Sequence, residues 1–270
     1  MAELFGILNL TDDSFSDGGK YVSKEAAIEK GKSLLQEGAD YLEVSGQSSN
    51  IDSQLVSEEL EWQRVSDPIR YFVKAGVRLS LDSFRASVQI RALDAGVRVI
   101  NDITGFTQNQ DPKFWKDHFS TKKETKLVIM HSHNGFMAQK ESNLTKENAL
   151  KKIQTFFRDR RSELISWGIP ETAMYFDPGM GFFLSPDPSV SFYVLQELNL
   201  LRLEFPNLMV SVSRKSFLGN SLGGVPVDKR DGITLACEIY LLDKKIPWIR
   251  THDVLKLRQA ERIWSLCRGN

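Results

Sequence analysis

Short apolar runs recur along the chain, and longer stretches with a different pattern separate them. The runs are rich in β-branched residues and have the length of buried strands. They cover residues 4–8, 41–44, 77–81, 98–100, 126–130, 173–176, 208–212 and 248–250. Between the runs, apolar residues recur three and four positions apart, which predicts helices. Two of these segments stop at Gly38 and Gly168, and a glycine in that place is a common helix end.

Eight units of a strand followed by a helix predict a parallel α/β sheet, and eight is the number that closes a barrel. A doubly wound open sheet would need fewer units or a second domain, and no linker in the sequence marks one. We therefore predict a single (β/α)8 TIM barrel, with residues 1–270 forming one domain. The length of 270 residues is slightly above the roughly 250 usual for this fold.

Polar residues stand at the end of all eight predicted strands. In such barrels the carboxyl ends of the strands meet on the face that carries the active site. The sequence therefore places a site there before any motif is considered. Two long loops on the same face, residues 11–21 and 45–57, are rich in small residues and are predicted to be lids. The polar strand ends are Asn9, Ser45, Asp82, Asn101 with Asp102, His131, Asp177, Ser213, and Thr251 with His252.

Composition narrows the partners. The 35 basic and 35 acidic side chains cancel, so the overall charge does not favour nucleic acid or an anionic membrane. Cys237 and Cys267 are the two cysteines and show no metal-ligand spacing, which favours free thiols in a reducing compartment. The first residues lack a signal-peptide pattern, and no apolar run reaches the roughly 18 residues of a membrane helix. We expect a cytoplasmic protein.

Eight strings, taken in order, resemble dihydropteroate synthase. They span nearly the whole chain, and although each string is weak alone, their order makes the resemblance specific. They read Gly6-Ile-Leu-Asn9-Leu-Thr11, Asp13-Ser-Phe15-Ser-Asp17-Gly-Gly19, Leu81-Asp82-Ser83, Asn101-Asp102-Ile103, Met130-His131, Asp177-Pro178-Gly179-Met-Gly181-Phe182, Ser213-Arg214-Lys215-Ser216 and Arg250-Thr-His252-Asp253-Val254. The resemblance implies condensation of 6-hydroxymethyl-7,8-dihydropterin pyrophosphate with p-aminobenzoate, giving 7,8-dihydropteroate and pyrophosphate in folate biosynthesis.

A pterin presents ring nitrogens, an amino group and a carbonyl along one flat edge. Oxygen acceptors and one ammonium or amide donor are needed to recognise it. Asp82, Asn101, Asp177 and Lys215 supply that set, and the family binds pterin at the matching positions. Taken singly, Asp82 could be a helix N-cap and Asp177 a turn residue. The resemblance also places Met130 against the pterin ring, where a thioether packs well.

Pyrophosphate requires positive charge and hydrogen-bond donors. Arg250 and His252 precede the last predicted helix, whose N-terminus favours anions, and arginine binds phosphate oxygens in a forked geometry. The resemblance implies that Asn9 ligates Mg²⁺, a cation that prefers oxygen ligands. Asp82, Lys215, Arg250 and His252 are the predicted catalytic residues. We expect a dissociative displacement at the pterin methylene without a covalent intermediate.

The p-aminobenzoate end departs from the usual family pattern. Asn50 stands where the family has an arginine, and Glu43 stands where an aspartate is usual; we assign Glu43 no role. Phe183 adds an aromatic residue after Gly181-Phe182. The Asn50 and Phe183 departures resemble the acquired, sulfonamide-insensitive branch, in which Phe183 would narrow the subsite against the drug. The predicted p-aminobenzoate residues are Phe15, Ser49, Phe182, Phe183 and Ser213.

Two other functions share much of this pattern. A methyltetrahydrofolate–corrinoid methyltransferase would have a similar barrel but no use for a pyrophosphate site. A pterin-binding protein without catalysis would be expected to have lost Asn9, Lys215 or Arg250, and all three are present. His131 and His133 lie two residues apart, but no cysteine or carboxylate cluster joins them, so we expect a structural role. The family suggests a homodimer.

Overall fold

The computed structural model describes residues 2–11, 23–48, 53–133, 135 and 141–269. Within them eight strands form one parallel sheet in the order β6-β5-β4-β3-β2-β1-β8-β7. A bridge between Phe176 and Leu208 joins the two ends of this order, so the sheet closes. The predicted (β/α)8 barrel is confirmed. The strands are β1 (Glu3–Asn9), β2 (Tyr41–Ser45), β3 (Leu79–Asp82), β4 (Val99–Asp102), β5 (Lys126–Met130), β6 (Met174–Asp177), β7 (Met209–Val210) and β8 (Trp248–Thr251).

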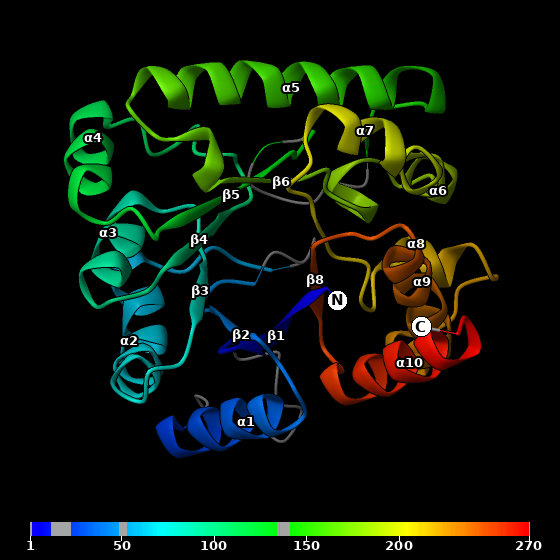
Figure 1. Cartoon of the computed structure of the whole chain (residues 1–270), viewed down its shortest axis with the longest axis horizontal. Helices are drawn as coiled ribbons and strands as arrows, with labels where there is room; N and C mark the ends of the chain where they lie inside the picture. Colours follow the sequence, from blue (N-terminus) through cyan, green and yellow to red (C-terminus); the bar gives the residue numbers. More distant parts are fainter. Residues whose placement is uncertain (1, 12–22, 49–52, 134, 136–140, 270) are drawn as a thin grey trace.

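Helices surround the ring of strands, as Figure 1 shows. Several begin at a side chain that accepts a backbone N–H: Ser23 caps the first helix, Ser57 the second and Asp253 the last. Gly38 and Gly168 follow helices with φ of 102° and 85°, so the predicted helix ends are confirmed. The helices are α1 (Lys24–Gln36), α2 (Glu58–Lys74), α3 (Ala86–Asp94), α4 (Pro112–Thr121), α5 (Lys146–Ser166), α6 (Pro188–Gln196), α7 (Leu198–Glu204), α8 (Ser216–Asn220), α9 (Asp231–Asp243) and α10 (Val254–Cys267), with short 3-10 turns η2 (Glu171–Ala173), η3 (Gly181–Phe183) and η4 (Val227–Lys229).

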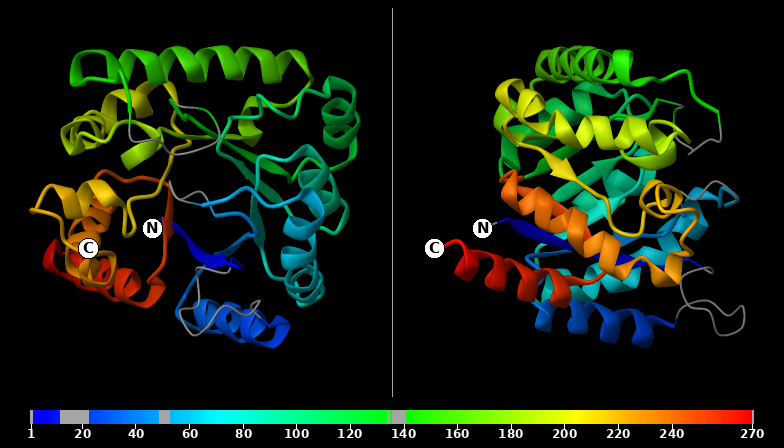
Figure 2. Two further views of the ribbon diagram at one scale, coloured as in Figure 1. Left: turned by 180° about the vertical axis from the view of Figure 1, so that it is seen from behind. Right: turned by 90° about the vertical axis from the view of Figure 1, so that its right-hand side faces the viewer.

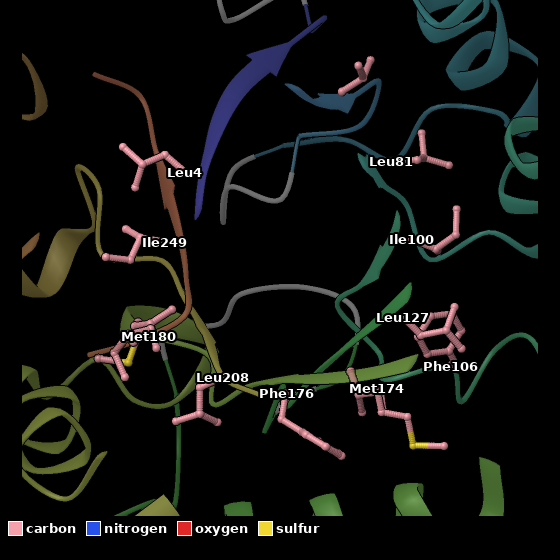
Figure 3. Close-up of a cluster of buried hydrophobic side chains, with 14 of the residues drawn as sticks. Leu4, Leu81, Ile100, Phe106, Leu127, Met174, Phe176, Met180, Leu208 and Ile249 are labelled. Carbon is pink, nitrogen blue, oxygen red and sulfur yellow. The ribbon is translucent and has the colours of Figure 1, made fainter. Parts of the chain in front are cut away.

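Alternation along each strand sorts side chains between two environments, because successive residues point to opposite faces. One set joins the strands to the helices in a single large apolar core. Figure 3 shows members of this core arranged around the strands, among them Leu4, Leu81, Ile100, Leu127 and Ile249. The other set points into the barrel.

The amino-end half of the barrel interior holds an aromatic layer, which we define as Phe5, Tyr41, Tyr175 and Trp248. The rings of Phe5 and Tyr41 are stacked with centroids 4.3 Å apart, and those of Tyr175 and Trp248 with centroids 3.4 Å apart. Trp248 Nε1 donates to Glu3 Oε2 at 2.8 Å. Phe5 is fully buried, so this layer closes the barrel at its amino end. A site inside the barrel can therefore open only toward the carboxyl ends of the strands.

Both chain ends lie on one side of the molecule, as the right-hand view of Figure 2 shows. β1 starts on that side, which makes it the amino-end face of the barrel. None of the helices in the described ranges is long and apolar enough to cross a membrane.

Candidate active site

Charged side chains occupy the barrel interior above the aromatic layer. Arg250 of β8 makes ion pairs with Glu43 of β2 and Asp82 of β3, the latter with Nη2 and Oδ2 2.5 Å apart. The Glu43 side chain is fully buried, and those of Asp82 and Arg250 are 12% and 15% exposed. Burial opposes the charge on Arg250, yet the two carboxylates raise its pKa. The predicted pyrophosphate residue thus lies within a buried charge cluster and contacts a predicted pterin residue.

Glu43 is held from three strands. Besides Arg250, its Oε2 accepts a hydrogen bond from Ser80 Oγ at 3.1 Å and from Asn101 Nδ2 at 3.2 Å. Burial raises the pKa of Glu43 to about 7, against the opposing effect of Arg250. Sequence reasoning assigned this residue no role, although a signal was present: Glu43 lies two positions before Ser45, so both side chains face the same side of β2.

Asp177 and Lys215 carry opposite charges and attract each other in the same site. Asp177 Oδ1 accepts the backbone N–H of Gly179 at 2.8 Å. Gly179 has a φ of 69°, and a Cβ there would lie 2.3 Å from the carbonyl oxygen of His131, so this turn requires glycine. Burial raises the pKa of Asp177 to about 6 and lowers that of Lys215 to about 8, with Arg250 also lowering the latter.

Apolar side chains line the site beside these charges. Met130, Ile103 and Phe183 form a small buried cluster with Phe84 and Phe182 packed against it. The ammonium of Lys215 lies 4.9 Å from the centre of the Phe183 ring, within the range of a cation–π contact. The structure therefore brings the predicted pterin methionine together with a predicted p-aminobenzoate residue.

His252, which follows β8, is in contact with Ser213 of the loop between β7 and α8. His252 Nδ1 lies 3.0 Å from Ser213 Oγ, and the His252 backbone N–H donates to the same oxygen at 3.1 Å. Burial lowers the pKa of His252 to about 3, helped by the nearby Arg214. The imidazole is therefore neutral at pH 7 and can offer a hydrogen bond but no charge.

A left-handed residue separates Ser213 from Lys215. Arg214 has a φ of 57°, a conformation that costs energy for any residue with a Cβ. Its backbone N–H donates to Thr234 Oγ1 at 3.1 Å, and its carbonyl oxygen accepts from Arg230 Nη1 at 2.9 Å. These contacts hold the turn that carries Ser213 and Lys215 toward the barrel.

Asn9 ends β1 beside Ser45 of β2 and is partly exposed. Across the described ranges, no group of three or more His, Cys, Asp or Glu side chains could hold a metal ion. The Asn9 amide fits Mg²⁺ if the ion takes most of its ligands from substrate phosphates and water, which is the usual arrangement for Mg²⁺. The Asn9 amide oxygen would then be the protein ligand.

Phe15 and Ser49, two of the predicted p-aminobenzoate residues, lie outside the described residues, as does Asn50. The two histidines discussed above have other partners: His131 Nδ1 lies 3.3 Å from the carbonyl oxygen of Pro178, and His133 Nε2 lies 2.5 Å from Asn143 Oδ1. Burial lowers the pKa of His131 to about 4.

Comparison with known proteins gives consistent matches over the whole barrel. The family model described as pterin binding enzyme matches residues 5–252. Dihydropteroate synthase type-3 of Escherichia coli is 36% identical, covering 97% of this chain and 98% of that protein. Dihydropteroate synthase type-2 of Escherichia coli is 38% identical, covering 95% of this chain and 93% of that protein. The solved structure of Yersinia pestis dihydropteroate synthase with a sulfonamide drug has a TM-score of 0.87 at 29% identity, covering 100% of this chain and 95% of that one.

Proposed function

The chain belongs to the pterin binding enzyme family, among the dihydropteroate synthases, and we propose the reaction of that enzyme as its function. It condenses 6-hydroxymethyl-7,8-dihydropterin pyrophosphate with p-aminobenzoate and releases 7,8-dihydropteroate and pyrophosphate, as a transferase of EC 2.5.1.15. The observation that carries this function is the set of acceptors and cations at one end of a closed barrel. Asp82 and Asp177 supply the acceptors, and Lys215 and Arg250 supply the cations.

The purified protein tests the function directly. With both substrates and Mg²⁺, pyrophosphate should appear much faster than with the pterin substrate alone, and dihydropteroate should form in equal amount. No dihydropteroate with both substrates and Mg²⁺, or pyrophosphate release that p-aminobenzoate does not accelerate, would contradict the proposal. A methyl-transfer enzyme or a non-catalytic binder would give neither product.

The pterin half of the site consists of Asp82, Asn101, Met130, Asp177 and Lys215. The carboxylate and amide oxygens accept the ring N–H and amino donors, while the Lys215 ammonium donates to the carbonyl. Since burial lowers the pKa of Lys215 only to about 8, the ammonium form is still the main one at pH 7. Met130 packs against the ring from the apolar side of the site.

Arg250, His252 and Asn9 form the pyrophosphate half. Arg250 lies deeper than expected from the sequence, because it is paired with Glu43 and Asp82. We assign the Arg250 guanidinium to the departing pyrophosphate, whose negative charge it would attract, and neutral His252 would supply a hydrogen bond to the departing oxygen. Mg²⁺, when bound through Asn9, would neutralise the pyrophosphate charge.

The chemical step is a dissociative displacement at the pterin methylene. The arylamine nucleophile is neutral at pH 7 and needs no strong base, so the difficult event is loss of pyrophosphate. Asp82 and Asp177 stabilise the electron-poor pterin, and Arg250 with His252 stabilises the departing anion. Carbon isotope effects test this step, because an associative second-order displacement without carbocation character would contradict it.

Phe183 belongs to the p-aminobenzoate end, together with Phe182 and Ser213, and Phe15 and Ser49 are proposed to complete it. Phe183 is 5% exposed and is fixed between Met130 and the Lys215 ammonium, so its ring cannot easily move aside for a bulkier ligand. We place the enzyme in the sulfonamide-insensitive branch on this basis. Phe183→Ala should bind sulfamethoxazole more tightly, whereas Phe182→Ala serves as the matched aromatic control. Equal drug inhibition of the unaltered enzyme and a sensitive relative would contradict the assignment.

The remaining parts of the proposal are a cytoplasmic location and a homodimer. The apolar residues Leu255, Ile263 and Leu266 of α10 are 45%, 60% and 63% exposed, and a second copy would cover them. Light scattering after size exclusion should give twice the chain mass of 30.7 kDa, and Leu266→Glu should reduce it.

A further inference from the structure

Asn101 presents a buried polar atom that has no hydrogen-bond partner among the described residues. The residue is 1% exposed, and its Nδ2 donates to Glu43 Oε2 at 3.2 Å. Its Oδ1 has no hydrogen-bond partner in the described part of the chain. An unsatisfied buried carbonyl is unfavourable for the folded protein, and in a site that binds a ligand the ligand can complete it.

The orientation of the Asn101 amide follows from what it faces. When Glu43 is ionised and paired with Arg250, its carboxylate only accepts hydrogen bonds, so the side of the amide toward Glu43 must be the NH2 group. Turning the amide over would set Oδ1 against Glu43 Oε2 and place two acceptors together. Glu43 therefore determines that Asn101 shows its oxygen to the rest of the site.

Glu43 is itself fixed at both oxygens. Arg250 lies against Oε1, while Ser80 Oγ donates to Oε2 at 3.1 Å. The side chain is fully buried, and another rotamer would lose these contacts. The same carboxylate therefore also holds the Arg250 guanidinium, which reaches Asp82 at its other end.

We propose that Glu43 is a positioning residue for pterin recognition: it directs the Asn101 carbonyl oxygen toward a ring N–H of the pterin and holds Arg250 beside Asp82. The inference rests on the pterin site proposed above. Glu43 does not touch the substrate. It makes Asn101 an acceptor, so that Asn101, Asp82 and Asp177 together select a heterocycle edge rich in donors.

Glu43→Gln is the decisive variant, because a neutral amide can donate to Asn101 Oδ1 and let Asn101 turn over. At about pH 8, where Glu43 of the unaltered enzyme is ionised, we expect KM for the pterin pyrophosphate to rise about tenfold while KM for p-aminobenzoate changes less than about twofold. Glu43→Asp keeps the acceptor and should retain much of the pterin affinity. An unchanged pterin KM in Glu43→Gln, or an equal rise in both KM values, overturns the inference.

Two further variants separate this inference from the function and from folding. Glu261→Gln is the control: this largely buried carboxyl of α10 pairs with Arg258 outside the barrel interior, and its loss should leave the pterin KM unchanged. Asn101→Ala tests the site itself. If it leaves the pterin KM unchanged, the proposed pterin site fails; if it raises that KM and Glu43→Gln does not, only the inference fails.

Should Glu43→Gln not fold, Ser80→Ala is the alternative. It removes one donor that fixes Glu43, and we expect the pterin KM to rise about threefold with little change for p-aminobenzoate. No change in the pterin KM would then overturn the inference.

Discussion

Replacing Arg250 by Met isolates the buried charge cluster. Met keeps an unbranched apolar stem but removes the guanidinium, which is the ion-pair partner of both Glu43 and Asp82. Two carboxylates are then left in the barrel interior, where Glu43 is fully buried and Asp82 is 12% exposed. Removing one partner of a buried pair costs about 3–5 kcal/mol, because the remaining charge is uncompensated. That is a large part of the roughly 5–15 kcal/mol by which domains are stable.

The loss in free energy of unfolding of Arg250→Met should increase with pH. Burial raises the folded-state pKa of Glu43 to about 7, above the unfolded value of 4.5. Its contribution to stability is therefore complete below about pH 4.5 and is lost as the pH rises through about 7. Without Arg250 the folded pKa is higher still, so the variant continues to lose stability above pH 7. The variant should lose about 1.4 kcal/mol between about pH 7 and pH 8, and because the unaltered enzyme still loses a few tenths over that range, the deficit should grow by roughly 1 kcal/mol.

Urea unfolding followed by circular dichroism at both pH values measures this difference. Arg258→Met is the matched control, since Arg258 pairs with Asp40 and Glu261 outside the barrel interior, where all three side chains reach solvent. Its deficit should be smaller and the same at both pH values. A deficit in Arg250→Met that does not change with pH would refute the assignment of an uncompensated Glu43.

Three other measurements test different parts of the molecule. Because burial lowers the pKa of Lys215 to about 8, kcat/KM should fall above that pH as the ammonium is lost, and a Lys215→Arg profile should stay flat there; the same alkaline fall in both would contradict the role of Lys215. Trp248→Leu removes the stacking on Tyr175 and the bond to Glu3, so urea unfolding should show a loss of about 3 kcal/mol while both KM values stay within about twofold; a changed pterin KM would mean that the aromatic layer shapes the site. Chelation by EDTA should stop product formation and added Mg²⁺ should restore it, with Asn9→Ala requiring more Mg²⁺; full turnover in EDTA would remove the metal from the proposal.

Much of the fold was predictable because local pattern and global geometry agree. The run at residues 126–130 coincides with β5, and every other strand begins and ends within about two residues of its predicted limits, although β7 shortens to Met209–Val210. Parallel strands in a closed barrel carry their last residues to one face, so Asp82, Asp177 and His252 could be placed together from sequence.

The pairing inside the barrel was not predictable. Arg250 and Asp82 are 168 residues apart, and their contact depends on the stagger between strands, which no local pattern records. The same holds for Lys215 above the Phe183 ring. Glu43 gave a partial signal, because a charged residue within a strand needs a buried partner. The sequence could not show that the partner was Arg250.

The aromatic layer has a consequence for hydration. Since Phe5 and Trp248 are almost completely buried, the aromatic layer separates Glu43 and Arg250 from water at the amino-end face, and we expect water to reach them from the carboxyl-end opening. A pterin bound in that opening would cut off this access, and the effective dielectric around the ion pairs would fall at the moment when pyrophosphate begins to leave. Release of dihydropteroate would restore the water. Because the aromatic layer closes the amino end, substrate binding itself would determine how strongly the ion pairs of Arg250 act.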